Sequence, residues 1–490
     1  MESRCVLPAR RSWGLTVQLY AARSATSWGI GDLGDLKRLG RWARELGAGF
    51  LLLNPLHAPI PGTPQQPSPY FPSSRRFRNP LYLRVDDPAR AEQGRALNHD
   101  SRIDRDAVWR LKMEALEAAW ARFDGDPLFD DYCKTEGQSL EYFATFCTVS
   151  EEHGGRPWRT WPEEQRRPGT AAAPRERVDF HRWLQWLIDE QLGAAAAEIL
   201  LVSDLAVGFD PDGADAWEFQ DLLAPGVSIG APPDAFNAAG QDWGLPPFDP
   251  GALRAAGYRP FVETLRAALR HAGGVRIDHV MGLFRLFWVP HGRPPADGSY
   301  VRYPSREILD LVAAESSRAG AFVVGEDLGT VEEGVREELA ARQVLSYRLL
   351  WFEPGAPSAY PERALAAVST HDLPTIAGVW TGADEAAPEL RNRLTELAGV
   401  GHEASADEVV EHTYAALATA PSLLVAASLE DALGVTQRPN QPGTVNDTNW
   451  SVALPLSLEE IEGDSRPRTI AQVLARRPLD RHPPPRPTLP

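Results

Sequence analysis

The feature that most constrains the fold is a series of eight short apolar runs separated by helical or polar segments. The runs span residues 14–20, 50–56, 200–207, 275–280, 322–328, 345–351, 365–369 and 422–427. Many are continuous rather than alternating, which is typical of parallel strands buried on both faces. Eight such units predict an α/β fold, a (β/α)8 TIM barrel with large, mostly helical insertions between strands. An open, doubly wound parallel sheet is the main alternative.

The spacing of the runs predicts how the chain is organised. The later runs follow one another closely, whereas long insertions separate the second, third and fourth, so we expect one inserted barrel over residues 1–490. Residues 98–178 are predicted to form a mostly helical insertion, because apolar residues recur there at helical spacing. Residues 224–251 combine Gly and Pro with Trp243, as a substrate loop does. The Pro-rich end, 482–490, is expected to be disordered.

The segment 27–36, SWGIGDLGDL, contains a Gly-x-Gly-x-x-Gly pattern that resembles a dinucleotide-binding loop. In dinucleotide folds the first glycine lies in the tight turn that ends the strand, but here residues 21–28 separate Gly29 from the first apolar run. Asp32 and Asp35 would also face the phosphates. We therefore interpret the segment as a turn in which Asp32 or Asp35 caps the next helix.

Composition argues against several classes of function. A net charge of -17 disfavours nucleic acid or an anionic membrane as a partner. The sequence has no apolar run long enough to span a membrane, no signal-like stretch near its start and no pairing pattern among its cysteines, so we expect a cytoplasmic protein. It has no HxH, HExxH or P-loop pattern and only three lysines, so we expect neither a metal nor a cofactor.

Carboxylates follow three of the apolar runs: Asp278 in VRIDHV, Glu326 in VVGEDLG and Asp372 in VSTHDLP. The carboxyl ends of all barrel strands lie on one face, so these acids are expected to share a pocket. Arg276, on the same strand face as Asp278, favours its charged form, whereas the apolar residues before Glu326 favour a protonated carboxyl. Retaining glycoside chemistry uses one charged and one protonated carboxyl group. Taken singly, an acid at a strand end is more often a helix cap or turn residue, and Arg276 and Asp278 could form only a structural ion pair.

Beyond these acids, the sequence resembles the 4-α-glucanotransferases, the family of amylomaltase or disproportionating enzyme. The shared motifs run in order through most of the chain: SWGIGDLGDL, NPLHA, SPYFPSSRRFRNPLY, DLAVG, GAPPDAFNAAGQDWGLPP, VRIDHVMGLFRLFWVP, GEDLGT, STHDLPT and RPNQPGTVNDTNW. The resemblance implies an inserted (β/α)8 barrel and a retaining enzyme without metal or cofactor. Such an enzyme transfers a segment of an α-1,4-glucan to the 4-hydroxyl of glucose or a maltooligosaccharide through a covalent glycosyl-aspartate.

The same resemblance implies a role for each matching residue. Asp278 looks like the nucleophile, Glu326 like the acid/base, and Asp372 like a third acid that holds sugar hydroxyls. The expected substrate-binding residues are Tyr70, Asp212, Gln241, Trp243, Arg276 and His371, with Gln241 and Trp243 on the acceptor side. The expected partners are therefore α-1,4-glucans and maltooligosaccharides, and neither nucleic acid nor a membrane.

Two other functions stay open from the pattern of residues. An α-amylase-like hydrolase would use the same acids with water as the acceptor. A catalytically silent glucan-binding protein would bind glucan without cleaving it. The aromatic loop around Trp243 favours a sugar acceptor over water, and the presence of all three acids disfavours a silent protein.

Overall fold

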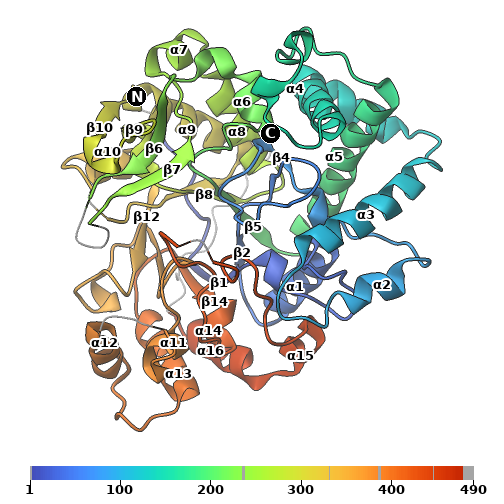
Figure 1. The fold of residues 1–490 in the computed structure, drawn as a ribbon. Helices are drawn as coiled ribbons and strands as arrows, with labels where there is room; N and C mark the ends of the chain where they lie inside the picture. Colours follow the sequence, from blue (N-terminus) through green and yellow to red (C-terminus); the bar gives the residue numbers. More distant parts are fainter. Residues whose placement is uncertain (1–2, 234–237, 330, 385–387, 445, 478–490) are drawn as a thin grey trace, which may run out of the picture.

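Eight parallel strands close into a barrel at the centre of the molecule (Figure 1). The computed structural model describes residues 3–233, 238–329, 331–384, 388–444 and 446–477. The barrel strands are β1 (Ser12–Val17), β2 (Phe50–Leu53), β5 (Leu200–Leu205), β8 (Gly274–Ile277), β11 (Phe322–Gly325), β12 (Leu345–Leu349), β13 (Ala364–Ala367) and β14 (Leu424–Ser428). They follow one another in chain order, and β14 pairs with β1. The predicted barrel is thus confirmed, and an open sheet is excluded.

The strands are short and deeply buried. Every residue of β2, β8, β11 and β13 is buried, as expected for parallel strands with side chains inside the barrel and helices outside. Several strands end before the apolar runs do: β5 ends at Leu205 although its run continues to residue 207, and β8 ends at Ile277. The functional side chains therefore lie in the loops that directly follow the strands.

Helices form a layer around the barrel (Figure 1). Those that connect or flank the strands are α1 (Leu33–Glu45), α5 (Arg175–Ala196), α8 (Arg259–Leu269), α9 (Ser305–Ala319), α10 (Val335–Ala341), α11 (Ile376–Thr381), α12 (Pro388–Ala398), α13 (Ala406–Leu417), α14 (Leu429–Ala432), α15 (Leu458–Gly463) and α16 (Ser465–Ala475). Among the described residues, no helix has the length and apolar content that crossing a membrane requires.

The glycine-rich segment starts α1 as a capped turn. Asp32 is the N-cap of α1 and accepts hydrogen bonds from the backbone N–H groups of Gly34 and Asp35, while the Asp35 side chain accepts from the Asp32 N–H. Arg84 donates to both carboxylates. The prediction that Asp32 or Asp35 caps this helix is confirmed, and the acidic cap and its arginine fill the position that a pyrophosphate would need.

A first insertion lies between β2 and β5. It contains β3 (His57–Ala58), β4 (Ser74–Arg78), α2 (Ala91–Ala96), α3 (Arg105–Trp120) and α4 (Pro127–Glu152), and its helices lie to the right of the barrel in Figure 1. α5 packs on both α4 and α1, and so joins the insertion to the barrel. The limits 98–178 for a separate helical unit stay a prediction.

A second insertion builds a small sheet beside the barrel. It follows β5 and contains α6 (Ala214–Glu218), β6 (Val227–Ala231), β7 (Gln241–Leu245) and α7 (Pro250–Ala255). β6 and β7 join β9 (Arg285–Pro290) and β10 (Ser299–Arg302) in an antiparallel sheet of order β10-β9-β6-β7. The expected loop 224–251 thus includes two strands. Residues 234–237 of this loop and the tail 482–490 lie outside the described residues.

Candidate active site

Neighbouring strands place Asp278 and Glu326 next to each other. Asp278 directly follows β8 and Glu326 directly follows β11, and the register of these strands pairs Gly325 with Ile277. The Glu326 N–H donates to the Ile277 carbonyl at 3.0 Å, and the Val280 N–H donates to the Glu326 carbonyl at 3.0 Å. A Cβ on Gly325 would lie 2.9 Å from a Val280 methyl, so only glycine allows this close approach.

Arg276 holds two carboxylates at once. Its Nη2 lies 2.8 Å from Asp278 Oδ1, and its Nη1 donates to both carboxylate oxygens of Asp204 at 2.6 and 2.8 Å. Burial opposes the charge of Arg276, but the two carboxylates outweigh burial and raise its pKa well above the ordinary value. Asp278 thus lies against a permanent positive charge, the environment that a carboxylate nucleophile requires.

The environment of Glu326, in contrast, favours a protonated carboxyl group. Its side chain is 9% exposed and accepts hydrogen bonds from the His279 N–H at 2.8 Å and the Leu328 N–H at 2.9 Å. Burial, followed by the negative charge of Asp278, raises the pKa of Glu326 to about 7, although Arg276 and the two N–H groups act in the other direction. A carboxyl with this pKa holds a proton in slightly acidic solution and releases it in slightly alkaline solution, as a general acid/base must.

Asp372 and His371 follow β13 and form a second charged pair. His371 Nε2 lies 3.5 Å from Asp372 Oδ2, and Asn440 Nδ2 donates to Asp372 Oδ1 at 2.6 Å. Partial burial opposes ionisation of Asp372, but His371 and Asn440 outweigh it and lower the pKa of Asp372. Burial acts against a charged His371, but Asp372 outweighs it and raises the pKa of His371. The Asp372 side chain is 42% exposed, so it is available to a ligand.

Aromatic rings form a wall beside this pair. The Tyr70 ring lies 4.8 Å from the His371 ring and 5.3 Å from the Trp450 ring, centroid to centroid, and the Tyr70 hydroxyl donates to Asp204 Oδ2 at 2.6 Å. The His371 and Trp450 rings are 5.0 Å apart. Trp450 adopts a φ of 60°, a left-handed conformation that is costly for a bulky residue. The position of Trp450 in this wall therefore requires a strained backbone.

The four-stranded sheet brings Gln241 and Trp243 to the edge of the site. Trp243 Nε1 donates to Gln241 Oε1 at 3.1 Å, and the Trp243 ring lies edge-on to His279, 5.4 Å between centroids. His279 neighbours Asp278 in the chain and adopts a φ of 47°, so it belongs to the turn after β8 and not to the strand. The indole therefore lies beside the turn that carries Asp278.

Of the residues selected from the sequence, the structure connects Asp278, Glu326, Arg276, Tyr70, His371 and Asp372 through these contacts. Asp212 is not among them: its carboxylate pairs with Arg159 at 3.1 Å, and its N–H donates to Asp210. Its predicted sugar contact stays a prediction.

Sequence reasoning missed Asp204. It is the only charged residue in the run LLVSDLAVG, and strand register pairs it with Arg276. An acid inside a buried strand is the signal that identifies it, because such a charge requires a partner. Asn440 was also missed, and it reaches Asp372 from a segment far along the chain, where no spacing rule applies.

Three carboxyl groups at the carboxyl ends of parallel barrel strands, one with a pKa raised to about 7 and another with a lowered pKa, define the class of barrel enzymes that cleave glycosidic bonds with carboxylates. Residues 17–457 match the family model described as 4-alpha-glucanotransferase. The chain belongs to this family.

Individual relatives agree with the family model. The 4-alpha-glucanotransferase of Mycobacterium tuberculosis is 43% identical, over 96% of this chain and 75% of that protein. The amylomaltase structure from Corynebacterium glutamicum is 34% identical with a TM-score of 0.85, and the match covers 95% of this chain and 75% of that one. An amylomaltase from Streptococcus agalactiae, solved in complex with acarbose, is 19% identical with a TM-score of 0.80, covering 94% and 98%, and shares the fold. The protein is therefore an enzyme that transfers segments of α-glucan.

Proposed function

We propose that transfer proceeds by double displacement on Asp278. In the first step an Asp278 carboxylate oxygen bonds to the anomeric carbon of the donor, the glycosidic C–O bond breaks, and Glu326 gives its proton to the leaving 4-oxygen. In the second step the 4-hydroxyl of an acceptor sugar bonds to the same carbon, its proton passes to Glu326, and the aspartyl ester breaks. Two inversions leave an α-linkage, and both acids return to their starting states.

One observation carries this proposal: of two adjacent acids, one is paired with a buried arginine and the other has a raised pKa. Arg276 lies 2.8 Å from Asp278, while burial raises the pKa of Glu326 to about 7. A nucleophile must be charged before the reaction, and a general acid must hold a proton. Neighbouring strand ends supply both conditions within one site.

The remaining residues are assigned by the contacts they make. Asp372 and His371 present an exposed carboxylate and an imidazole with a raised pKa, which suit hydrogen bonds to the hydroxyls of the donor sugar. The ring of Tyr70 offers a face for that sugar, and Arg276 orients the nucleophile. Trp243 and Gln241, beside the turn after Asp278, are assigned to the acceptor. Asp212 is proposed as a further sugar contact from its sequence motif alone.

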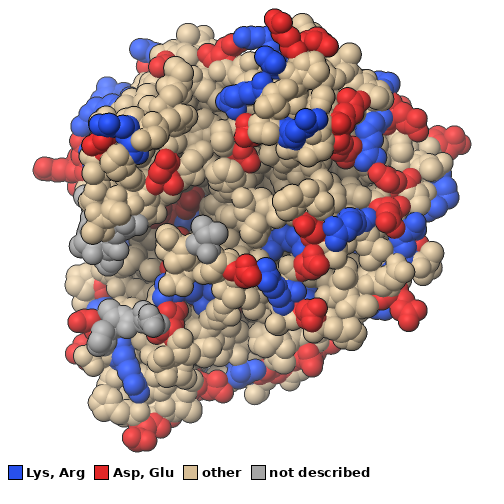
Figure 2. All heavy atoms as spheres, viewed as in Figure 1, with Lys and Arg blue, Asp and Glu red and all other residues tan. Residues whose placement is uncertain are grey.

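The substrates proposed are α-1,4-glucans and maltooligosaccharides, as donors and as acceptors. We propose no role for nucleic acid, in keeping with the net charge of -17 and with the interspersed acidic and basic side chains in Figure 2. Cys5, Cys133 and Cys147 are free and buried, which supports a reducing cytoplasmic location.

Incubation with pure maltotriose tests the proposal. A transferase produces glucose together with a ladder of longer maltooligosaccharides. Maltose and glucose alone would mean that water is the acceptor and would contradict transfer. An unchanged substrate, combined with measurable binding, would mean a silent glucan-binding protein.

A further inference from the structure

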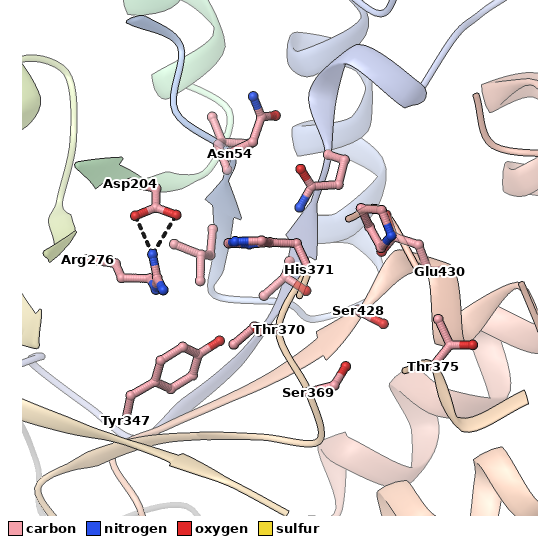
Figure 3. A pocket seen from close by; sticks show the side chains of 15 residues that line it. Asn54, Asp204, Arg276, Tyr347, Ser369, Thr370, His371, Thr375, Ser428 and Glu430 are labelled. Carbon is pink, nitrogen blue, oxygen red and sulfur yellow. Dashed lines mark hydrogen bonds and ion pairs between the residues drawn. The ribbon is translucent and has the colours of Figure 1, made fainter. Parts of the chain in front are cut away.

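A polar chamber lies inside the barrel next to His371 (Figure 3). In Figure 3, His371 is located between the Asp204–Arg276 pair on one side and Glu430 on the other. The chamber is also lined by polar side chains that the proposed mechanism does not use: Thr16, Gln18, Asn54, Ser369, Thr370, Thr375, Ser428 and Glu430. Such a concentration of polar groups in the interior of a barrel requires partners for them.

Glu430 is a fourth acid at the end of a barrel strand. It follows β14 by two residues and is the second residue of α14. The residue is 7% exposed, and within the described part of the chain its carboxyl is bonded to its own backbone N–H and to no side chain. Burial raises the pKa of Glu430 to about 7, Asp431 adds to this increase, and His371 opposes it. A buried acid without a side-chain partner is costly unless it has a role.

Gln18 supplies a second observation from a different strand end. It directly follows β1, and its Oε1 is buried and has no hydrogen-bond partner among the described residues, although the residue lines the same chamber. Buried cavities with several polar groups hold ordered water, which bonds to the groups that protein atoms leave unpaired. Water in this chamber would connect Gln18 and Glu430 to His371, which lines the same space.

The charges around His371 show which acid is free to act on it. The titratable and charged groups that face it are Tyr70, Asp204, Arg276, Asp372 and Glu430. Asp204 is already bound to Arg276, and the exposed Asp372 is the acid assigned to sugar hydroxyls. Glu430 has no such competing side-chain partner in the part of the chain that the structure describes. Its own charged neighbours are Asp431 and His371, and Asp431 is bound to the Tyr414 hydroxyl and the Ile376 N–H.

We propose that Glu430 is a positioning residue that acts on His371 through water held in this chamber, keeping the imidazole protonated and turned toward the donor sugar. The proposal rests on the assignment of His371 to the donor sugar. Above neutral pH the ionised Glu430 adds a negative charge near the ring, so His371 keeps its proton after a sugar has engaged Asp372. At lower pH Glu430 is neutral, and solvent protons alone keep His371 charged.

Histidine NMR on the intact protein tests this coupling directly. The ring signals of His371, identified by their loss in His371→Asn, are followed against pH in the wild type and in Glu430→Gln. We expect the His371 midpoint to fall by about half a pH unit or more in Glu430→Gln. The matched control, Glu408→Gln, changes an exposed acid on α13 and should leave the midpoint unchanged. An equal midpoint in Glu430→Gln and the wild type would overturn the proposal.

The wild type provides a test that needs no variant. If Glu430 titrates beside the ring, the His371 signals carry a second inflection near the Glu430 pKa of about 7. A curve with one inflection would contradict the coupling even if Glu430→Gln failed to fold. Neither NMR result depends on transfer, so a failure of the proposed function, seen as hydrolysis of maltotriose, is recognised separately.

Kinetics separate positioning from a structural effect. With α-maltosyl fluoride, whose leaving group needs no proton, the KM of Glu430→Gln should exceed that of the wild type about threefold or more at about pH 8 and match it at about pH 6, with kcat little changed. Glu430→Asp keeps the charge and should recover most of the difference. A KM that rises equally at both pH values would indicate general damage to the site and would refute the positioning role.

Discussion

The raised pKa of Glu326 predicts how transfer depends on pH. Burial and the charge of Asp278 raise this pKa from 4.5 to about 7, so the carboxyl loses its proton as the pH rises through 7. With this pKa the protonated fraction is about 90% at pH 6 and about 10% at pH 8, whereas a pKa of about 4.5 would leave about 3% at pH 6. We therefore expect kcat/KM for maltotriose to fall about fivefold between pH 7 and pH 8 and about tenfold for each further pH unit.

The assay measures initial glucose release from maltotriose between about pH 5 and about pH 9 at constant ionic strength. α-Maltosyl fluoride is the matched control substrate, because departure of fluoride needs no proton from Glu326, and its rate should stay level where the maltotriose rate falls. Glu326→Gln should react with the fluoride and scarcely with maltotriose. An alkaline limb near pH 5, or one near pH 7 that persists with the fluoride, would refute the assignment of this pKa to the general acid.

Three substitutions test other parts of the structure. Trp243→Ala should lower transfer about tenfold relative to hydrolysis, because a buried aromatic contact contributes about 1–3 kcal/mol; the ratio of oligomer formation to new reducing ends from maltotriose measures this, and an unchanged ratio would remove Trp243 from the acceptor side. Asp204→Asn leaves Arg276 paired with Asp278 alone. The undivided positive charge then stabilises the Asp278 carboxylate and makes it a weaker nucleophile, so kcat with α-maltosyl fluoride should fall about tenfold or more. An unchanged kcat would contradict the shared role of Arg276. Lys112→Met removes an ammonium group that donates to two backbone carbonyls at 2.7 and 2.8 Å, and should lower the free energy of unfolding by about 2–4 kcal/mol. Urea unfolding measures this loss, and an unchanged midpoint would show that the carbonyls find other partners.

The barrel was predictable because each strand is a continuous apolar run. Burial on both faces leaves a strong signal in composition, and all eight predicted runs overlap a barrel strand. Strand ends were less predictable, since apolar residues such as Val207 continue into the loops and look the same in sequence. The small sheet containing β6 and β7 was read as a loop, because its Gly- and Pro-rich sequence carries no clear alternation.

The acids of the site were predictable from their position at strand ends, but their partners were not. Arg276 was connected to Asp278 by strand alternation, whereas its bond to Asp204 depends on the register between β5 and β8. Asn440 and Trp450 reach the site from a loop far along the chain, and such contacts are determined by packing rather than by local spacing. Electrostatic environment likewise depends on the folded arrangement, which is why the pKa of Glu326 required the structure.

A trapping experiment tests the central claim, that Asp278 carries the sugar, most directly. Glu326→Gln is mixed with α-maltosyl fluoride, quenched and digested, and the peptide containing Asp278 is examined by mass spectrometry. Because the variant can form the ester but lacks the base that activates an acceptor, we expect a maltosyl group to accumulate on Asp278. The same treatment of a protein that also carries Asp278→Asn should leave this peptide unmodified. A maltosyl group on a different residue would contradict the account.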